Sequence, residues 1–266
     1  MIKGFQASLA AGPQLGVCVM YPAPGIIERI GPDWDWIWID GQHGEMGYQD
    51  ILACVRACDL VGRPSIVRVP GHDAGAIGKV LDAGAAGVMV PMVDDAEQAK
   101  QAVRAAKFPP LGSRSYGGRR PIDRFGRGYA NRDEAQPLLV CQIETPEGLA
   151  NVDAIAAVDG VDVLLFGPDD MALRQGMPMD APRPEGCFDD AHRKVAQAAR
   201  SHGKHAGGVF LTPATMRFAV EIGYRLIVSA ADVLFLAQGS KQSSETLHNL
   251  RLDLSRSGAA SQNSPY

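Results

Sequence analysis

The sequence predicts a single-domain α/β protein, a (β/α)8 TIM barrel, on the evidence of three observations. The chain has 266 residues, and such barrels commonly span roughly 250 residues. Short runs rich in Val, Ile and Leu alternate with longer alanine-rich segments of helical period. Eight strand-like runs are present, and 46% of the residues are hydrophobic, enough for a large core. We expect the barrel over residues 1–255 and a disordered tail over 256–266.

The expected strands and helices follow one another in regular order along the chain. The strands are expected at 15–20, 35–40, 64–70, 87–93, 138–144, 161–167, 205–210 and 225–230. The helices are expected at 23–31, 48–62, 73–85, 94–108, 146–158, 188–203 and 212–223, and an eighth after residue 232. Several begin near Asp, Thr or Pro and close on glycine, as helices tend to do. An open doubly wound sheet is the alternative, but YPAPG after the first strand is not a dinucleotide-binding turn.

Composition narrows the classes of function. The formal net charge of −4 gives no sign of a nucleic acid or anionic membrane partner. The amino-terminal residues are too polar for a signal peptide, and no apolar run approaches the roughly 18 residues of a membrane span. Five scattered cysteines make a disulfide framework unlikely and favour the cytoplasm. Cys54 and Cys58, four residues apart, are expected to pack in a helix rather than to bind a metal.

The segment 111–137 interrupts the alternation. It contains six arginines: Arg114, Arg119, Arg120, Arg124, Arg127 and Arg132. Loops of this length in a compact domain are usually functional or lie at an interface. A solvated basic loop is the alternative.

Polar residues follow four of the expected strands at the point where each strand ends. They are Asp40, Gln42 and His43 after the second strand, Arg68 in the third, Glu144 in the fifth, and Asp169 and Asp170 after the sixth. Each has a simple structural explanation on its own, such as capping the next helix. The carboxyl ends of barrel strands share one face, however, and barrel enzymes carry their chemistry there. The set therefore predicts an active site.

Glu144 and Asp170 come from neighbouring strands and form a hard oxygen site suited to Mg²⁺ or Mn²⁺. A cation with two protein ligands keeps positions open for water and for a 2-oxo acid. Arg68 is permanently charged and is expected to donate to the same keto oxygen. Both cations would stabilise the negative charge that develops on that oxygen as an enolate forms.

The turn after the second strand supplies candidates for proton transfer. Histidine is the side chain that most often transfers protons in enzymes at physiological pH, and His43 is expected to act as the base. Asp40, three residues earlier, is expected to orient the His43 ring or to stabilise its charged form. Gln42 is expected to hold, without adding charge, a water that the cation binds.

These residues lie in stretches that resemble the HpcH/HpaI family of class II, metal-dependent pyruvate aldolases. The matching stretches are DWIWIDGQHG, VRVP, KVLDAGAAGVMVPMVDDAEQA, QIETPEG and FGPDDM. They span residues 33–240 in the family's order, and as a set they are specific.

The resemblance implies a barrel with Mg²⁺, Mn²⁺ or Co²⁺ bound by Glu144 and Asp170. It also implies Arg68 on the keto oxygen and His43 as an acid/base acting through water. It associates Asp82, in LDAGA, with the active site. It assigns the pyruvate carboxylate to the backbone of Gly167, Pro168 and Asp169. Family members exchange their last helix between subunits and form hexamers, as trimers of dimers.

The chain departs from the family pattern at two places. Gln42 stands where many members have Glu, which removes a charge beside the cation. After FGPDD the family often continues with Leu-Ser, but this chain has MALRQG. Arg174 is therefore expected either at the mouth of the site or in a solvated loop.

The expected function is retro-aldol cleavage of a 4-hydroxy-2-oxo acid to pyruvate, or a related 2-oxo acid, and an aldehyde, together with the reverse addition. An oxaloacetate-type decarboxylase and a citrate-lyase-like carbon–carbon lyase are alternatives that share the enolate. A non-catalytic barrel that binds 2-oxo acids is an alternative of another class. Schiff-base catalysis is disfavoured, because the lysines considered mostly fall on expected helices or their flanks rather than at strand ends.

Overall fold

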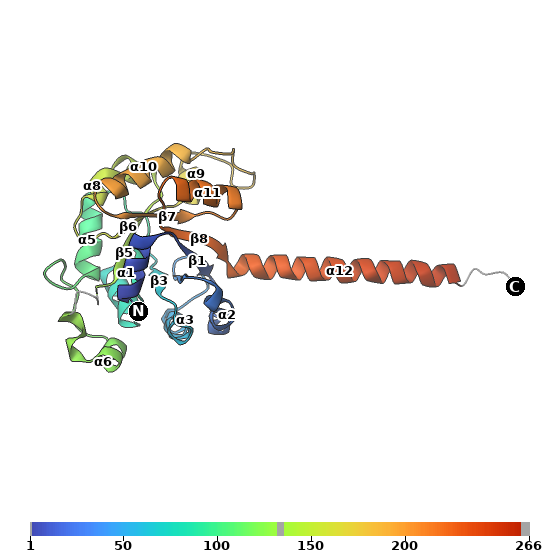
Figure 1. The fold of residues 1–266 in the computed structure, drawn as a ribbon, viewed down its shortest axis with the longest axis horizontal. Coiled ribbons are helices and arrows are strands. Elements are labelled where there is room, and N and C mark those ends of the chain that lie inside the picture. Colours follow the sequence, from blue (N-terminus) through green and yellow to red (C-terminus); the bar gives the residue numbers. More distant parts are fainter. Residues whose placement is uncertain (1, 132–135, 262–266) are drawn as a thin grey trace.

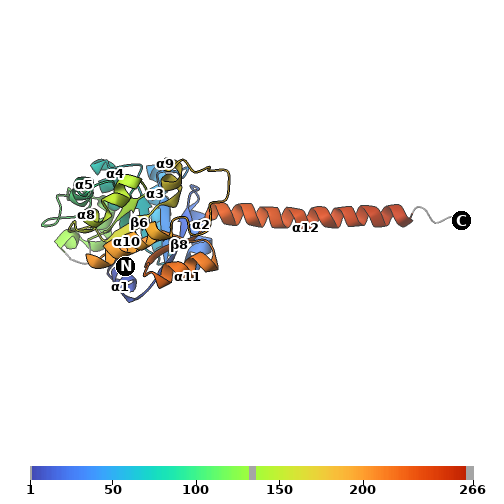
Figure 2. The same cartoon turned by 90° about the horizontal axis from the view of Figure 1, so that it is seen from above.

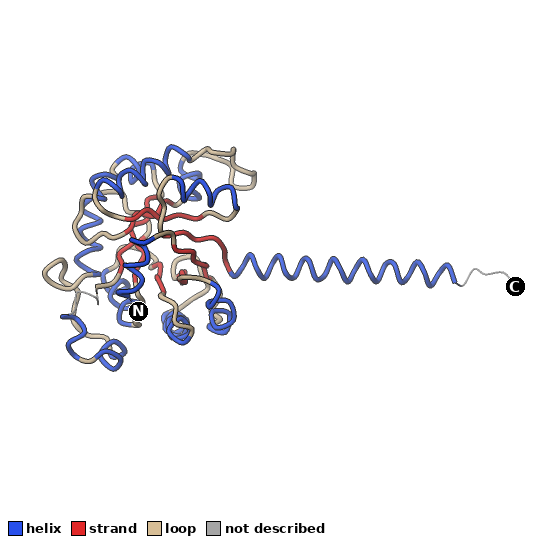
Figure 3. Tube along the Cα trace, in the orientation of Figure 1, coloured by secondary structure: helices blue, strands red, loops and turns tan. Residues whose placement is uncertain are grey.

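The computed structural model describes residues 2–131 and 136–261. In this part of the chain, eight parallel strands form one closed barrel in sequence order, and β8 pairs with β1. Figure 3 shows the strands at the centre and the helices around them. The closed barrel confirms the predicted fold and excludes the open doubly wound sheet.

Each predicted strand is present, and most are shorter than predicted. Their bounds are β1 Gln14–Val19, β2 Trp36–Asp40, β3 Ser65–Arg68, β4 Gly87–Val90, β5 Leu138–Ile143, β6 Val163–Phe166, β7 His205–Val209 and β8 Leu226–Ala231. The largest differences are at β3, β4 and β6, which are each three residues shorter than predicted. After β4 the chain turns at Met92, which has a φ of 53°.

Most helices of the described residues surround the barrel, whereas α12 extends away from it (Figure 1). Their bounds are α1 Ile2–Ala11, α2 Pro24–Ile30, α3 Tyr48–Leu60, α4 Ala74–Asp82, α5 Ala96–Ala106, α6 Arg119–Phe125, α7 Pro146–Ala150, α8 Val152–Ala156, α9 Pro168–Arg174, α10 Asp189–Ser201, α11 Pro213–Glu221 and α12 Asp232–Ser261. The helix expected at 146–158 is divided at Asn151, whose side chain donates to the carbonyl of Asp94. Helices α1, α6 and α9 were not predicted.

Alternation along the strands separates two cores. In β2, Trp36 and Trp38 point into the barrel, whereas Ile37 and Ile39 point outward and pack among the surrounding helices. The outer core also holds Cys54 and Cys58, as expected, and all five cysteines are free. The polar groups at the carboxyl ends of the strands lie next to this packed inner core.

Helix α1 closes the amino-terminal end of the barrel. Its Phe5 and Leu9 are buried in the inner core, and the Phe5 ring centroid lies 6.4 Å from that of Trp36. Figure 2 shows α1 and α9 at opposite ends of the barrel. The opening that remains is therefore at the carboxyl ends of the strands.

Helix α12 leaves the barrel and extends away from it (Figure 1). Its first residue, Asp232, is buried and accepts hydrogen bonds from the N–H groups of Met20 and Tyr21, which follow β1. The expected tail at 256–266 begins inside this helix, which continues to Ser261, and residues 262–266 lie outside the described part of the chain. No helix in the described ranges combines the length and apolarity needed to cross a membrane.

The basic segment forms two short helices and ion pairs over its described part, and many of its side chains, including Arg119 and Arg127, are exposed, so the solvated-segment alternative stays open. Arg120 and Arg124 both pair with Asp59 at the end of α3, and Tyr129 donates to the carbonyl of Gly117 at 2.6 Å. Arg132 lies outside the described residues. The segment follows α5 and packs near the ends of α3 and α4. It therefore belongs to the amino-terminal side of its own barrel, away from the strand ends that carry the predicted site.

Candidate active site

Asp40 and Arg68 form a buried ion pair at the carboxyl ends of β2 and β3. The register of the two strands places them side by side. Nε of Arg68 donates to Oδ1 of Asp40 at 2.9 Å, and Nη2 donates to Oδ2 at 2.5 Å. Asp40 is 1% exposed and Arg68 is 7% exposed. Such a two-point contact fixes the guanidinium plane and leaves the N–H groups of Nη1 for a substrate.

The environment of the pair favours its charged form. Burial alone would raise the pKa of Asp40, but the hydrogen bonds and charge of Arg68, together with two backbone N–H groups, bring that pKa below its ordinary value. Trp38, two residues before Asp40 on the same face of β2, lies against the guanidinium, 4.7 Å from Cζ to the ring centroid. Arg68 is thus held by the carboxylate of Asp40 and by the ring of Trp38.

The turn at residues 41–45 presents Gln42 and His43 beside this pair. Oδ1 of Asp40 accepts from the backbone N–H groups of Gln42 and His43 at 3.0 and 3.2 Å. The sequence predicts that Asp40 orients the His43 ring or stabilises its charged form. The hydrogen bonds of Asp40 go instead to Arg68 and to the turn backbone, so the first role is not supported and the second stays a prediction. Gly44 closes the turn, where a Cβ would lie 2.2 Å from the Asp40 carbonyl oxygen. His43 is exposed, whereas Oε1 of Gln42 is buried without a hydrogen-bond partner among the described residues.

Glu144 directly follows β5 and is 2% exposed. Its Oε1 accepts from the backbone N–H of Met92 at 2.9 Å. A Cβ on Gly167 would lie 2.6 Å from its Oε2, so only glycine leaves room for this carboxylate. Burial raises the pKa of Glu144 to about 7, the Met92 N–H opposes that rise, and the charge of Asp170 adds to it.

Asp170 lies half-buried in the first turn of α9. The turn before it contains the three residues that the resemblance assigns to the pyruvate carboxylate, Gly167, Pro168 and Asp169. The N–H of Gly167 donates to the carbonyl of Ile143, and proline has no N–H. The turn therefore offers the N–H groups of Asp169 and Asp170, which stand where a helix leaves amides without intrahelical partners. The side chain of Asp169 pairs with Arg183.

These donors fit a hard divalent cation. Glu144 and Asp170 are close enough for one negative charge to raise the pKa of the other carboxyl group. A cation between them would remove that repulsion and keep Glu144 ionised. The described residues contain no cluster of three His, Cys, Asp or Glu side chains arranged as a cage. Two protein carboxylates would thus leave most coordination positions open.

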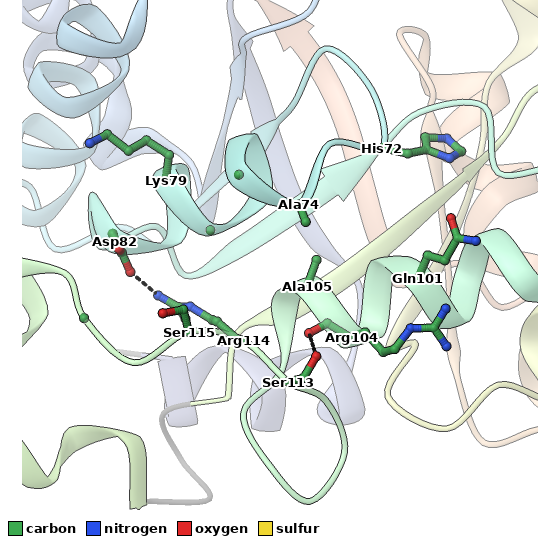
Figure 4. A pocket seen from close by; sticks show the side chains of 13 residues that line it. His72, Ala74, Lys79, Asp82, Gln101, Arg104, Ala105, Ser113, Arg114 and Ser115 are labelled. Atoms are coloured by element: carbon green, nitrogen blue, oxygen red, sulfur yellow. Dashed lines mark hydrogen bonds and ion pairs between the residues drawn. The ribbon is translucent and has the colours of Figure 1, made fainter.

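Asp82 is not brought to this site within its own chain. It is the last residue of α4, which runs back from the end of β3 toward the opposite end of the barrel. Its Oδ1 accepts from Nη2 of Arg114 at 2.7 Å (Figure 4). Both residues line a cavity of about 700 Å³ between α4, α5 and the segment 113–117. Of the predicted site residues, Asp82 alone lies apart from the strand ends.

Three further residues support the site and were not assigned from the sequence. Trp38 underlies Arg68, and the two-residue spacing from Asp40 was the signal for it. Met92 holds Glu144 through its backbone at a φ of 53°, a conformation that sequence pattern does not reveal. His72, in the loop after β3, lies 2.7 Å from the carbonyl oxygen of Pro91 through Nε2 and so contacts the residue before Met92.

Sequence and structure comparisons find similar proteins over most of the chain. The model of the HpcH/HpaI aldolase/citrate lyase family matches residues 26–229. A 4-hydroxy-2-oxovalerate aldolase of Novosphingobium aromaticivorans is 38% identical, over 90% of this chain and 92% of its own. A hydroxypyruvate/pyruvate aldolase of Rhizorhabdus wittichii is 33% identical, over 79% of this chain and 84% of its own. The crystal structure of a family member from Burkholderia cenocepacia superposes with a TM-score of 0.83 at 30% identity, covering 92% of this chain and 99% of that one.

Proposed function

This chain belongs to the HpcH/HpaI aldolase/citrate lyase family, and from that premise we propose that it cleaves 4-hydroxy-2-oxo acids to pyruvate, or a related 2-oxo acid, and an aldehyde. It is a carbon–carbon lyase of the pyruvate aldolase class. The relatives to which it is similar over most of its length are aldolases of this class. The reverse aldol addition follows from the same site. The observation that carries the proposal is the buried Asp40–Arg68 pair beside the Glu144 carboxylate at one end of the barrel.

Glu144 and Asp170 would hold the divalent cation, Mg²⁺, Mn²⁺ or Co²⁺. When bound, the cation acts as a Lewis acid that withdraws electrons from the keto group of the 2-oxo acid. The chain supplies two anionic oxygen donors for it, and Gly167 and the Met92 amide fix the position of the buried one. The fixed carboxylate lowers the cost of organising the site when a cation binds.

Arg68 would act on the keto oxygen through Nη1. Its other donors are engaged by Asp40, so the guanidinium has little freedom to turn away. Negative charge grows on the keto oxygen as the bond between C3 and C4 breaks. A preoriented cation stabilises that charge more than it stabilises the neutral ketone. The N–H groups of Asp169 and Asp170 would receive the substrate carboxylate.

His43 would handle the protons. In the cleavage direction it removes the proton of the 4-hydroxyl group, directly or through a water. The C3–C4 bond then breaks, and its electrons stay with the C3 fragment as an enolate. C3 of this enolate takes up a proton to give pyruvate. Gln42 would position that water with its buried, unpartnered amide oxygen. Because a glutamine amide does not exchange a proton at neutral pH, Gln42 would leave the proton transfer to His43.

The subunit arrangement is also a proposal. Apolar side chains along α12 are exposed and would be covered if the helix packed on a neighbouring copy. Exchange of this helix within a hexamer, a trimer of dimers, remains our expectation. Asp82 lies at the wrong end of its own barrel, so a catalytic role for it requires that another copy's site meet it in such an assembly. Small-molecule substrates and a cytoplasmic location stay part of the proposal.

Exchange of the C3 protons of pyruvate in D₂O, followed by NMR with and without Mn²⁺, tests this function. We expect exchange that requires the cation and falls at least 100-fold in His43→Ala. His202→Gln, which changes an outer histidine near Asp153, should exchange like the unaltered protein. A non-catalytic binding barrel would show no exchange under either condition. Exchange at full rate in His43→Ala would refute the role of this histidine.

A further inference from the structure

Arg174 stands at the rim of the site. It is the last residue of α9 and follows Asp170 by four positions, so the two side chains share one face of the helix. Asp170, on that face, is the residue proposed to hold the cation together with Glu144. One turn of helix, about 5.4 Å, separates Arg174 from Asp170 along the axis. Arg174 therefore lies about one helical turn beyond Asp170 on the same face of α9, and it is exposed.

A contact across the opening fixes the direction in which Arg174 points. Its Nη2 lies 3.4 Å from Sδ of Met92, in the chain that follows β4. The backbone N–H of the same Met92 holds Glu144. Arg174 and Glu144 thus approach one residue from two sides. The positive charge of Arg174 also lowers the pKa of Glu144, as expected for a guanidinium close to that carboxylate.

The neighbouring arginines are already neutralised. Arg68 forms its two-point contact with Asp40, and Arg183 pairs with Asp169. Over the described ranges, the recorded partner of Arg174 is a thioether sulfur, and no carboxylate pairs with it. Sulfur is a weak acceptor for a guanidinium, which prefers the planar fork of a carboxylate. The donors of Arg174 remain available to an anionic ligand.

We propose that Arg174 binds a carboxylate at the far end of the substrate and so selects 4-hydroxy-2-oxo dicarboxylic acids. The inference rests on the proposed function, which places the 2-oxo acid end of the substrate against Arg68, Glu144 and Asp170. The remaining carbons then extend from this end toward the rim. The aldehyde that leaves after cleavage would carry the carboxylate bound by Arg174. Arg174 makes and breaks no bond.

Equilibrium binding separates this inference from the function on which it rests. 2-Oxoglutarate and 2-oxovalerate both have a five-carbon chain and lack the 4-hydroxyl group, so neither can be cleaved. They differ in the distal carboxylate. In titrations of the full-length protein with Mn²⁺ present, we expect 2-oxoglutarate to bind about 10-fold more tightly. In Arg174→Ala, with folding checked by its melting temperature, this preference should fall to about one.

A matched arginine provides the control. Arg104 is exposed in the last turn of α5 and pairs with Glu97 at 2.9 Å. Arg104→Ala should keep the preference for 2-oxoglutarate. Equal affinities of the two acids for the unaltered protein, or an unchanged preference in Arg174→Ala, would overturn the inference while leaving the aldolase proposal intact. Failure of both acids to bind would count against both.

Aldol addition of pyruvate gives a second readout. Glyoxylate carries the acceptor carboxylate, and glycolaldehyde is its neutral counterpart of similar size. We expect the ratio of kcat/KM for glyoxylate to that for glycolaldehyde to fall about 10-fold in Arg174→Ala. Arg174→Lys should retain part of the preference, because a lysine keeps the charge but loses the fork. A ratio that stays constant across both variants would contradict the role of Arg174.

Discussion

Arg68 reaches the site already oriented, because Asp40 receives two of its N–H bonds and Trp38 lies against its guanidinium. Both supports come from β2, the neighbouring strand, so the geometry depends on backbone pairing rather than on a loop. Preorganised donors of this kind need no rearrangement when charge develops on a substrate. The orientation of one guanidinium is therefore a property of the barrel itself.

Replacing Arg68 with lysine tests that orientation. Arg68→Lys keeps a positive charge but cannot span both oxygens of Asp40. We expect kcat for aldol cleavage to fall by about 100-fold or more, whereas the melting temperature should change little. Steady-state kinetics with the Mn²⁺-loaded protein measures the effect. A lysine variant within a few fold of the unaltered protein would show that a point charge is sufficient.

Gly167 offers a steric test of the Glu144 position. A Cβ at Gly167 would meet Oε2 of Glu144 at 2.6 Å and displace the carboxylate. Gly167→Ala should therefore weaken Mn²⁺ binding about 10-fold or more, measured by calorimetric titration. Gly71→Ala is the control, since a Cβ there meets nothing within 4 Å. Equal affinities of the two variants would mean that Glu144 does not need this position.

Single residues show how far the site could be predicted from the sequence. Asp40, Arg68 and Glu144 were found because polar side chains at the ends of hydrophobic strands are conspicuous. The partner of Asp40 was not predicted, because whether its side chain meets the His43 ring or Arg68 depends on strand register. The role of Met92 depends on a backbone conformation that a methionine rarely adopts. Contacts between distant segments and unusual backbone angles were thus the parts that could not be predicted.

Helix α10 packs against the barrel through a buried histidine. His192 is 8% exposed, and Nδ1 lies 2.9 Å from the hydroxyl of Tyr224. Its recorded ring neighbours are Phe166, Tyr224, Phe210 and Phe218. Burial in these surroundings lowers the pKa of His192 to about 4. The folded barrel therefore holds this histidine in its neutral form.

Stability should depend on pH through His192. Between about pH 6.5 and pH 4 the unfolded chain binds a proton at this residue that the folded chain does not, so the free energy of unfolding falls as the pH falls. The loss from this group approaches about 3 kcal/mol near pH 4 and does not grow below it. His192→Phe should unfold in urea with a flatter dependence over this range. His202→Gln should keep the dependence of the unaltered protein, and identical slopes for all three proteins would refute the assignment.

The elements differ in how well their sequences predict them. All eight strands were predicted, since each is a compact apolar run bounded by polar or glycine-rich segments. Helix α1 was missed, and it is held by the end of the barrel, where its Phe5 and Leu9 are buried in the inner core. Helices α6 and α9, of seven residues each, lie in segments that were assigned from the sequence to the basic segment and to the turn of the site. Tertiary contacts decide such elements.

The outline of the whole molecule is set by α12, which extends away from the barrel with exposed leucines (Figure 1). Leu247 and Leu250 are 64% and 54% exposed and share one face of the helix. A single helix with an uncovered apolar face is unfavourable in water, and burial of each leucine would contribute about 2 kcal/mol. The architecture thus favours association with another copy of the chain.

Charge on that face should disrupt the assembly. Leu247→Glu is expected to convert the oligomer to a smaller species, because a carboxylate would be buried in an apolar contact. Light scattering after size-exclusion chromatography measures the mass. Asn249→Glu, on the other side of α12, should leave the mass unaltered. A monomeric unaltered protein, or a full-sized Leu247→Glu oligomer, would contradict the proposed helix exchange.

Glu144 and Asp170 are proposed to hold one divalent cation at the carboxyl ends of the strands. Titration with Mn²⁺, followed by the EPR signal of the free ion, tests it most directly. We expect one Mn²⁺ per chain, bound at least 100-fold more weakly by Glu144→Gln and by Asp170→Asn, which keep the shape of each side chain. Affinity and stoichiometry unchanged in both variants would contradict the account.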